Sequence, residues 1–207
     1  MLKVPFSLIT AGALFLLFLT SCAENNLETV ENRDADGRLE RWQRNKKDFS
    51  KEGLYQRFYP DGTLAEEAHF MHDSLEGEHK YFYKNGSIES LEHYRNGTFH
   101  GKYLKYSEDG KLMLEQEYVN GVMQGFSVAY YPGGVLKEKY TMRDNDENGP
   151  FWEYYENGRL HWEGTFGPGK DGSAEQGELK EYDETGQLIR IADCTDGRCP
   201  TRWELKK

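Results

Sequence analysis

The side chains that could carry acid–base or metal chemistry are scattered along the chain and do not form one motif. The histidines are His69, His72, His79, His93, His100 and His161. Because His69 and His93 occupy the same place in a 24-residue repeat, repetition explains them more simply than a shared metal ion does. Carboxylates recur in the same way, whereas acid–base catalysis needs a unique pair. The sequence therefore predicts a protein that is not an enzyme, with no catalytic residue, cofactor or metal.

One acidic segment raises a separate hypothesis of calcium binding. Residues Asp144-Asn145-Asp146-Glu147-Asn148 place several oxygen ligands in a short run. They lack the ligand spacing of the EF-hand loop and its closing glutamate. We therefore assign no metal to this segment.

The beginning of the chain has the pattern of an export signal. One charge, Lys3, precedes an apolar run over residues 4–19, which is shorter than the roughly 20 residues that span a bilayer. The run ends in Leu19-Thr20-Ser21-Cys22, which resembles the lipobox of bacterial lipoproteins. The resemblance implies that residues 1–21 are a signal peptide and that the acylated Cys22 anchors the protein to a lipid bilayer. An uncleaved anchor and an ordinary secretory signal are the alternatives.

The residues after Cys22 bear on localisation and on the start of the fold. In enterobacteria an Asp directly after the cysteine favours retention in the inner membrane, so Ala23 favours the outer membrane of a bacterial cell envelope. Residues 22–36 are polar and nearly free of large apolar side chains, which predicts a flexible tether after the lipidated cysteine. The folded domain is then expected over residues 37–207.

The two other cysteines, Cys194 and Cys199, lie near the end of the chain. An even number of cysteines in an oxidising compartment predicts a disulfide between them. If Asp196-Gly197 form a two-residue turn, the cysteines become directly opposed neighbours whose close approach suits that bond.

The composition favours strands and turns and excludes one class of partner. The chain is 14% aromatic and contains 14 Tyr and 22 Gly, which is typical of an all-β protein. Removal of residues 1–21 leaves 25 basic against 36 acidic residues, a net charge of −11. Such a surface repels nucleic acid, so no nucleic-acid partner is expected.

A 24-residue repeat organises the rest of the chain. Each copy has a Gly followed two residues later by an aliphatic residue, at Gly62/Leu64, Gly86/Ile88, Gly110/Leu112, Gly134/Leu136, Gly158/Leu160 and Gly186/Leu188. Two strands per repeat, with turns at both ends, account for the spacing. The last interval is 28 residues, and its extra residues within 167–176 predict a mobile loop.

The turn chemistry predicts the register. Pro60-Asp61-Gly62 suits a three-residue hairpin loop that places Phe58 opposite Leu64. We expect the same loop type at the other end of the hairpins, at Arg95-Asn96-Gly97 and Val119-Asn120-Gly121. One apolar face would then hold three landmarks of every repeat: the aromatic before the turn, the aliphatic after it, and a large residue further along the second strand, such as Phe70. On that face Trp152 is expected opposite Trp162 and Leu104 opposite Leu114.

Four tyrosines recur one residue after the first-strand aromatic, at Tyr59, Tyr83, Tyr131 and Tyr155. One interpretation is that they shield the mixed face of the sheet with their hydroxyls in water. The other is that they form a ladder of exposed rings that contacts a partner. We keep the four as candidate partner-binding residues.

The repeat unit, seen most fully in residues 77–125, is similar to the variant MORN repeat of bacterial proteins, many of which are labelled antitoxin-like. The resemblance covers about residues 37–197 and implies β-hairpin arrays that bind proteins. The strong negative charge argues against phospholipid binding by the repeats themselves.

These patterns predict an all-β fold: an elongated, twisted antiparallel meander of about six hairpin repeats, with roughly 12–14 strands. The leading hypothesis is a membrane-anchored lipoprotein that acts as a non-catalytic scaffold for a protein or an envelope polymer. The alternative is an antitoxin or immunity protein that binds one cognate toxin. The sequence leaves open whether the apolar face stays open or coils into a closed core.

Overall fold

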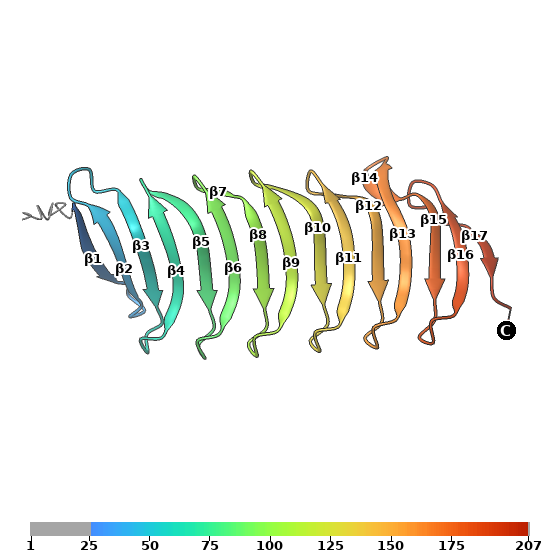
Figure 1. Ribbon diagram of the computed structural model, residues 1–207, viewed down its shortest axis with the longest axis horizontal. Coiled ribbons are helices and arrows are strands. Elements are labelled where there is room, and N and C mark those ends of the chain that lie inside the picture. Colours follow the sequence, from blue (N-terminus) through green and yellow to red (C-terminus); the bar gives the residue numbers. More distant parts are fainter. Residues whose placement is uncertain (1–25, 207) are drawn as a thin grey trace, which may run out of the picture.

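The computed structural model describes residues 26–206, which form one open antiparallel sheet of seventeen strands (Figure 1). The long strands pair in chain order, so the chain runs as a meander from one end of the sheet to the other. The short strands β7 and β14 pair only with β6 and β13, which also pair with β8 and β15. The prediction of an elongated all-β meander is confirmed, with more strands than expected. The sheet stays open, because its two ends lie far apart in Figure 1.

The strands are β1 (Leu27–Arg33), β2 (Leu39–Asn45), β3 (Lys51–Phe58), β4 (Leu64–Met71), β5 (Ser74–Phe82), β6 (Ile88–Arg95), β7 (Thr98–Phe99), β8 (Gly101–Tyr106), β9 (Leu112–Val119), β10 (Val122–Tyr130), β11 (Leu136–Arg143), β12 (Asp146–Tyr154), β13 (Leu160–Gly169), β14 (Gly172–Glu175), β15 (Gly177–Tyr182), β16 (Leu188–Cys194) and β17 (Thr201–Glu204). We number the repeats from one to six, starting with the hairpin of β3 and β4. The extra residues of the last interval lengthen β13 and form β14, so the expected loop is a strand pair.

The first hairpin corrects the expectation of a tether. Residues 27–33 form β1, and all seven pair with β2. Salt bridges from Arg41 to Glu31 and from Arg44 to Glu28, both 2.7 Å, join the two strands. Polar side chains suit this strand because it lies at the end of the sheet, where charge also discourages pairing with other chains. Cys22 and residues 1–21 lie outside the described residues.

At one end of the hairpins the predicted three-residue loops are confirmed. The Tyr59 N–H donates to the Thr63 carbonyl at 2.8 Å, and Gly62 supports the loop with a φ of 88°. A glycine is favoured there because other residues rarely adopt this left-handed conformation. The expected aromatic–aliphatic pairs all form, at Phe58–Leu64, Phe82–Ile88, Tyr106–Leu112, Tyr130–Leu136, Tyr154–Leu160 and Tyr182–Leu188.

At the other end the expected loop type is wrong. Arg95 pairs with Thr98, which leaves a two-residue loop of Asn96 and Gly97, both with positive φ values of 49° and 72°. The loop at residues 120–121 has the same form. Asn-Gly pairs favour this tight turn because both positions tolerate the left-handed conformation and its twist matches that of the strands.

A bulge next to each three-residue loop corrects the predicted cross-strand pairs. Phe58 pairs with Leu64, but Arg57 pairs with Glu66, so Ala65 has no partner residue across the strands. Beyond the equivalent bulge in later repeats every pair is shifted by one. Trp152 therefore lies opposite Glu163 and not Trp162, and Leu104 lies opposite Glu115 and not Leu114.

The same bulge separates the three landmarks onto two faces. Phe70 packs edge to face against Tyr55, with ring centroids 5.8 Å apart, on the face away from Phe58. We call the face of Tyr55 and Phe70 the core face, because most of the buried residues lie on it. Its packing pairs large with small side chains across the strands: Tyr55 with Ala68, Phe151 with Gly164 and Leu179 with Ala192.

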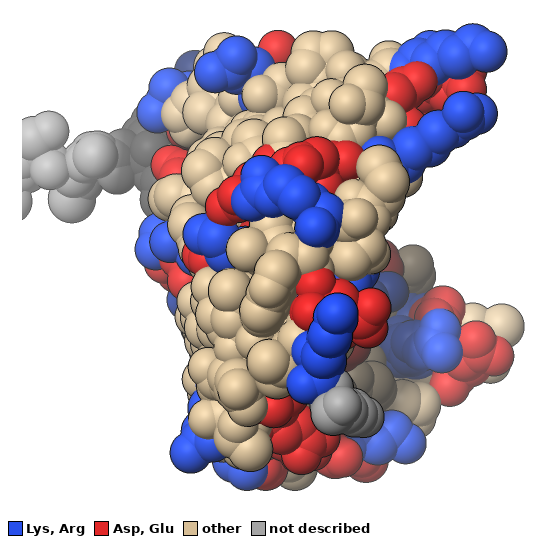
Figure 2. Space-filling view, turned by 90° about the vertical axis from the view of Figure 1, so that its right-hand side faces the viewer, with Lys and Arg blue, Asp and Glu red and all other residues tan. Residues whose placement is uncertain are grey.

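The sheet is bowed, and charges of both signs are mixed at its C-terminal end. In Figure 1 the strands curve in the same sense, and from the C-terminal end the molecule has an outline hollowed on one side. Basic and acidic side chains lie next to each other in that view (Figure 2). The surface at this end therefore carries neighbouring charges of both signs.

Candidate functional site

The face opposite the core face carries one row of directly opposed side chains that crosses the whole sheet. We call it the charged row. It consists of Glu31, Arg41, Gln56, Glu67, Lys80, Leu91, Leu104, Glu115, Val128, Lys139, Trp152, Glu163, Lys180, Ile191 and Trp203. Because paired strands lie about 4.8 Å apart, each side chain can contact its neighbours in the row.

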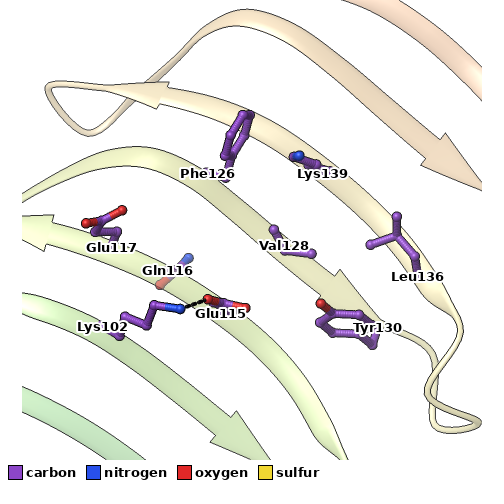
Figure 3. A pocket seen from close by; sticks show the side chains of 9 residues that line it. All are labelled: Lys102, Glu115, Gln116, Glu117, Phe126, Val128, Tyr130, Leu136 and Lys139. Carbon is purple, nitrogen blue, oxygen red and sulfur yellow. Dashed lines mark hydrogen bonds and ion pairs between the residues drawn. The ribbon is translucent and has the colours of Figure 1, made fainter.

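A hollow of about 420 Å³ lies on this face where repeat three meets repeat four (Figure 3). Its lining residues are Lys102, Glu115, Gln116, Glu117, Phe126, Val128, Tyr130, Leu136 and Lys139. Apolar side chains of β10 and β11 form one side, and Phe126 is 45% exposed. On the other side Lys102 donates to Glu115 at 2.6 Å, and this hydrogen bond raises the pKa of Lys102. The hollow has the size of a small-ligand pocket, with an apolar floor and a charged rim.

Lys139 lies at the edge of this hollow against aromatic rings. Its Nζ lies 3.8 Å from the ring centroid of Phe126 and 5.7 Å from that of Trp152. Among the described residues, no carboxylate lies within 4.0 Å of this ammonium. The other cations of the charged row are ion-paired: Arg41 with Glu31, Lys80 with Glu78, and Lys180 with both Glu163 and Glu178. Two aromatic rings therefore hold a positive charge without an acidic partner.

Repeats four and five differ from the others at this surface. The three outward positions of the first strand are Leu54, Gln56 and Phe58 in repeat one, Glu78, Lys80 and Phe82 in repeat two, Lys102, Leu104 and Tyr106 in repeat three, and Glu178, Lys180 and Tyr182 in repeat six. They are Phe126, Val128 and Tyr130 in repeat four and Pro150, Trp152 and Tyr154 in repeat five. These two repeats alone carry neither a charged nor an amide side chain at the three positions. We call their six residues the apolar patch, which is a local departure from the repeat.

The four candidate tyrosines have a structural role that the sequence did not predict. Each hydroxyl donates to a main-chain carbonyl of the next repeat at 2.8–2.9 Å: Tyr59 to Phe82, Tyr83 to Tyr106, Tyr131 to Tyr154 and Tyr155 to Tyr182. The interpretation that the hydroxyls point into water is therefore wrong. We call these four bonds tyrosine braces; they join consecutive repeats.

One junction between repeats lacks such a brace. Ser107 stands at the position of the tyrosine in repeat three, and its hydroxyl bonds within its own turn, to Asp109 and to the Lys111 carbonyl. The junction between repeats three and four is therefore held without a tyrosine brace. It is the same junction that contains the hollow.

His79, Cys194 and Cys199 make structural contacts. His79 is 6% exposed on the core face, and its Nε2 lies 2.8 Å from a Glu66 oxygen. Glu66 also pairs with Arg57 at 2.7 Å, so a polar network replaces apolar packing in this part of the core.

Cys194 and Cys199 form a disulfide across a two-residue turn. In the acidic segment, Asp144 and Asn145 adopt the positive φ values of another such turn.

Phe126, Val128 and Lys139 were not predicted as site residues from the sequence. The signal that could have found them is the comparison of outward positions across repeats, in which repeats four and five stand out. This comparison needs the correct register, and the bulge was not predicted. Figure 3 shows these side chains on neighbouring strands of one face.

The fold defines a class of protein, a β-hairpin repeat array built as a single sheet. Comparison with known families identifies the repeat: the MORN repeat variant matches residues 51–72, 75–96, 99–120 and 175–193. These four segments therefore match the variant MORN repeat, which confirms the resemblance at these positions. The matched segments leave out residues 121–174, although β10 to β13 keep the loops and register of the other repeats. No curated protein matches the chain.

The part of the chain that the structure describes contains no helix long and apolar enough to cross a membrane.

Proposed function

We propose that this protein is a lipid-anchored, non-catalytic scaffold of the bacterial cell envelope, whose elongated sheet binds a protein or an envelope polymer. The observation that carries the proposal is the apolar patch of repeats four and five, at positions where each of the other four repeats carries a charged or amide side chain. Exposed apolar patches rimmed by polar groups are typical of interaction sites. The patch has no counterpart in repeats one, two, three and six, so the repeat fold alone does not require it.

The anchor rests on the amino-terminal sequence. Cys22 follows an apolar run that ends in small residues, as in bacterial lipoproteins. Two acyl chains and an N-acyl group would supply stable attachment through burial of their hydrocarbon. Ala23 favours the outer membrane as the site of attachment. In this arrangement the lipid holds one end of the sheet at the membrane, and the charged face is free to bind.

Cells fed with labelled palmitate test the anchor. The wild-type chain is expected to incorporate label and to fractionate with the outer membrane. Cys22→Ala should abolish both. A labelled Cys22→Ala chain, or a wild-type chain that remains in the soluble fraction, would contradict the anchor.

A crosslinked pull-down from envelopes tests the scaffold. Phe126→Ser combined with Trp152→Ser should remove the species that the wild-type chain captures. Glu78→Ser combined with Lys80→Ser, at the equivalent positions of repeat two, is the matched control and should capture them normally. If a lipidated peptide of residues 22–36 captures the same species as the whole chain, the repeats are not the binding element and the proposal fails.

A further inference from the structure

The hollow at the junction of repeats three and four has one feature that repetition does not explain, a lysine that lacks an acid. The chain has ten more acidic than basic residues, so cations readily find carboxylates within it. Arg41, Lys80 and Lys180 do so in the charged row. Lys139 instead lies against the rings of Phe126 and Trp152.

We propose that Lys139 is the anchoring point for a carboxylate of a protein partner, whose neighbouring apolar side chains enter the hollow beside Val128 and Leu136. This inference rests on the proposed scaffold function and names the chemistry of its partner. The two rings fix the ammonium at the edge of the hollow, so the charge is positioned before the partner arrives.

The composition of the surface favours a protein over the other partners of the proposed function. Protein interfaces have an apolar centre that contains aromatic residues, and a polar rim. Here Phe126, Val128 and Leu136 form the centre, and the ion pair of Lys102 and Glu115 lies on the rim. A polymer of uniform negative charge would meet Glu115 and Glu117 at that same rim. An apolar segment with a single acidic side chain avoids this repulsion and pairs with Lys139.

The missing tyrosine brace gives the site a further property. No tyrosine of repeat three bonds to repeat four, so the two walls of the hollow are linked by main-chain pairing and by the Gln116 amide, which donates to the Ser127 hydroxyl at 3.1 Å, without a tyrosine brace. The pairing of β9 with β10 has the same register shift as the braced pairs β4–β5 and β11–β12, so the missing brace is what distinguishes this junction. The hollow can therefore adjust its width to an entering side chain more easily than the braced junctions can.

Site-specific photocrosslinking in the cells that make the protein tests the inference. A benzophenone amino acid replaces Phe126 in the full chain, and replaces Glu78 or Val119 in two control chains. Position 126 is expected to crosslink to a polypeptide other than this chain, at a segment in which an Asp or Glu adjoins apolar residues. A crosslink to a glycan, to a second copy of the chain or to a segment without an acid would overturn the inference.

Two charge variants then test the role of Lys139. The crosslinker is placed for this purpose at Val128, so that Phe126 stays in place. Lys139→Met should lower the crosslink yield by about tenfold, the order of magnitude for loss of a close interfacial charge pair. Lys180→Met removes one positive charge from the same row and should change the yield by less than about twofold, because that charge is already paired. Equal losses in the two variants would show that only overall charge matters.

A charge exchange gives the sharpest outcome. Lys139→Glu should abolish the crosslink, and replacement of the partner's acidic residue by Lys should restore it in that variant. Failure of the exchange overturns the assignment of Lys139. If position 126 gives no product while position 78 or 119 does, the scaffold proposal stands and this inference fails; absence of products at all three positions contradicts both.

Discussion

The hydroxyl of Tyr131 lies 2.8 Å from the carbonyl oxygen of Tyr154, one repeat further along the chain. Four such tyrosine braces join consecutive repeats, and each satisfies a carbonyl next to a three-residue loop. In an array where each repeat contacts only its neighbours, stability depends on the interfaces between repeats. The braces therefore connect the sequence of one repeat to the stability of the next.

Loss of one brace should weaken the array. Tyr131→Phe removes the donor and leaves the Tyr154 carbonyl without this bond, so the free energy of unfolding should fall by about 0.5–1.5 kcal/mol. Urea denaturation followed by circular dichroism measures the change. Tyr130→Phe, at the adjacent residue, is the control and should stay within about 0.5 kcal/mol of wild type. A loss of equal size in both variants would contradict a specific role for the Tyr131 hydroxyl.

A brace can be added at the junction that lacks one. Ser107→Tyr should place a hydroxyl within reach of the Tyr130 carbonyl and raise the free energy of unfolding by about 0.5–1.5 kcal/mol. Ser107→Phe supplies the ring without the donor, so the difference between the two variants in the same denaturation experiment isolates the bond. No difference between them would show that the junction cannot accept a brace.

The small residues of the core face should tolerate little growth. A Cβ at Gly164 would lie 2.8 Å from Phe151 Cε1 and 2.9 Å from Leu179 Cδ1. Gly164→Ala should therefore cost about 1–3 kcal/mol through overpacking, measured as a lower denaturation midpoint. Gly133→Ala is the matched control, because nothing lies within 4 Å of its added Cβ. It should leave stability unchanged or raise it by up to about 1 kcal/mol.

Two glutamates should respond to pH with opposite signs. Burial raises the pKa of Glu147, and the neighbouring Glu175 and Glu138 add to the effect. A raised pKa means that the fold favours the protonated form, so the stability this group contributes is present below its unfolded pKa and is lost as pH rises through the folded value. Glu147→Gln should therefore be more stable than wild type at pH 7, by a margin that shrinks toward pH 4 in denaturation experiments.

Glu78 is the control for that experiment. A hydrogen bond and charge attraction from Lys80 lower the pKa of Glu78. The stability it contributes is present above the unfolded pKa and is lost as pH falls through the folded one. Glu78→Gln should therefore be less stable than wild type at pH 7, with the deficit shrinking at acid pH. The same sign for both variants would show that the amide substitution, and not the charge, determines the effect.

The sequence predicted those parts of the fold that depend on local chemistry. Pro60-Asp61-Gly62 specifies a three-residue loop through its own dihedral preferences, and the loop in turn fixes the pair of Phe58 and Leu64. The six aromatic–aliphatic pairs follow from the same rule and were correct. The type of turn at Asn96-Gly97 could also have been read from the residues, because Asn-Gly is the preferred pair for a two-residue loop.

The faces of the sheet could not be predicted in this way. An unpaired residue such as Ala65 places every later side chain of its strand on the opposite face of the sheet from the one expected without it. No residue type marks the position of such a bulge. Phe70 therefore lies on the core face, and Trp152 lies opposite Glu163. The candidate site was missed for the same reason, since Lys139 reaches both Phe126 and Trp152 only in the shifted register.

The sequence by itself determined the repeat, the hairpins and the loops at one end, because these depend on glycine, proline and aromatic residues at fixed short spacings. It also carries the pattern of an export signal ending at Cys22. Only the tertiary structure decided which side chains share a face, that β1 extends the sheet to Leu27, and that four tyrosine hydroxyls join neighbouring repeats. The physical reason is that the tyrosine braces join residues 23 to 27 positions apart, and that a single bulge reverses the alternation of the side chains beyond it.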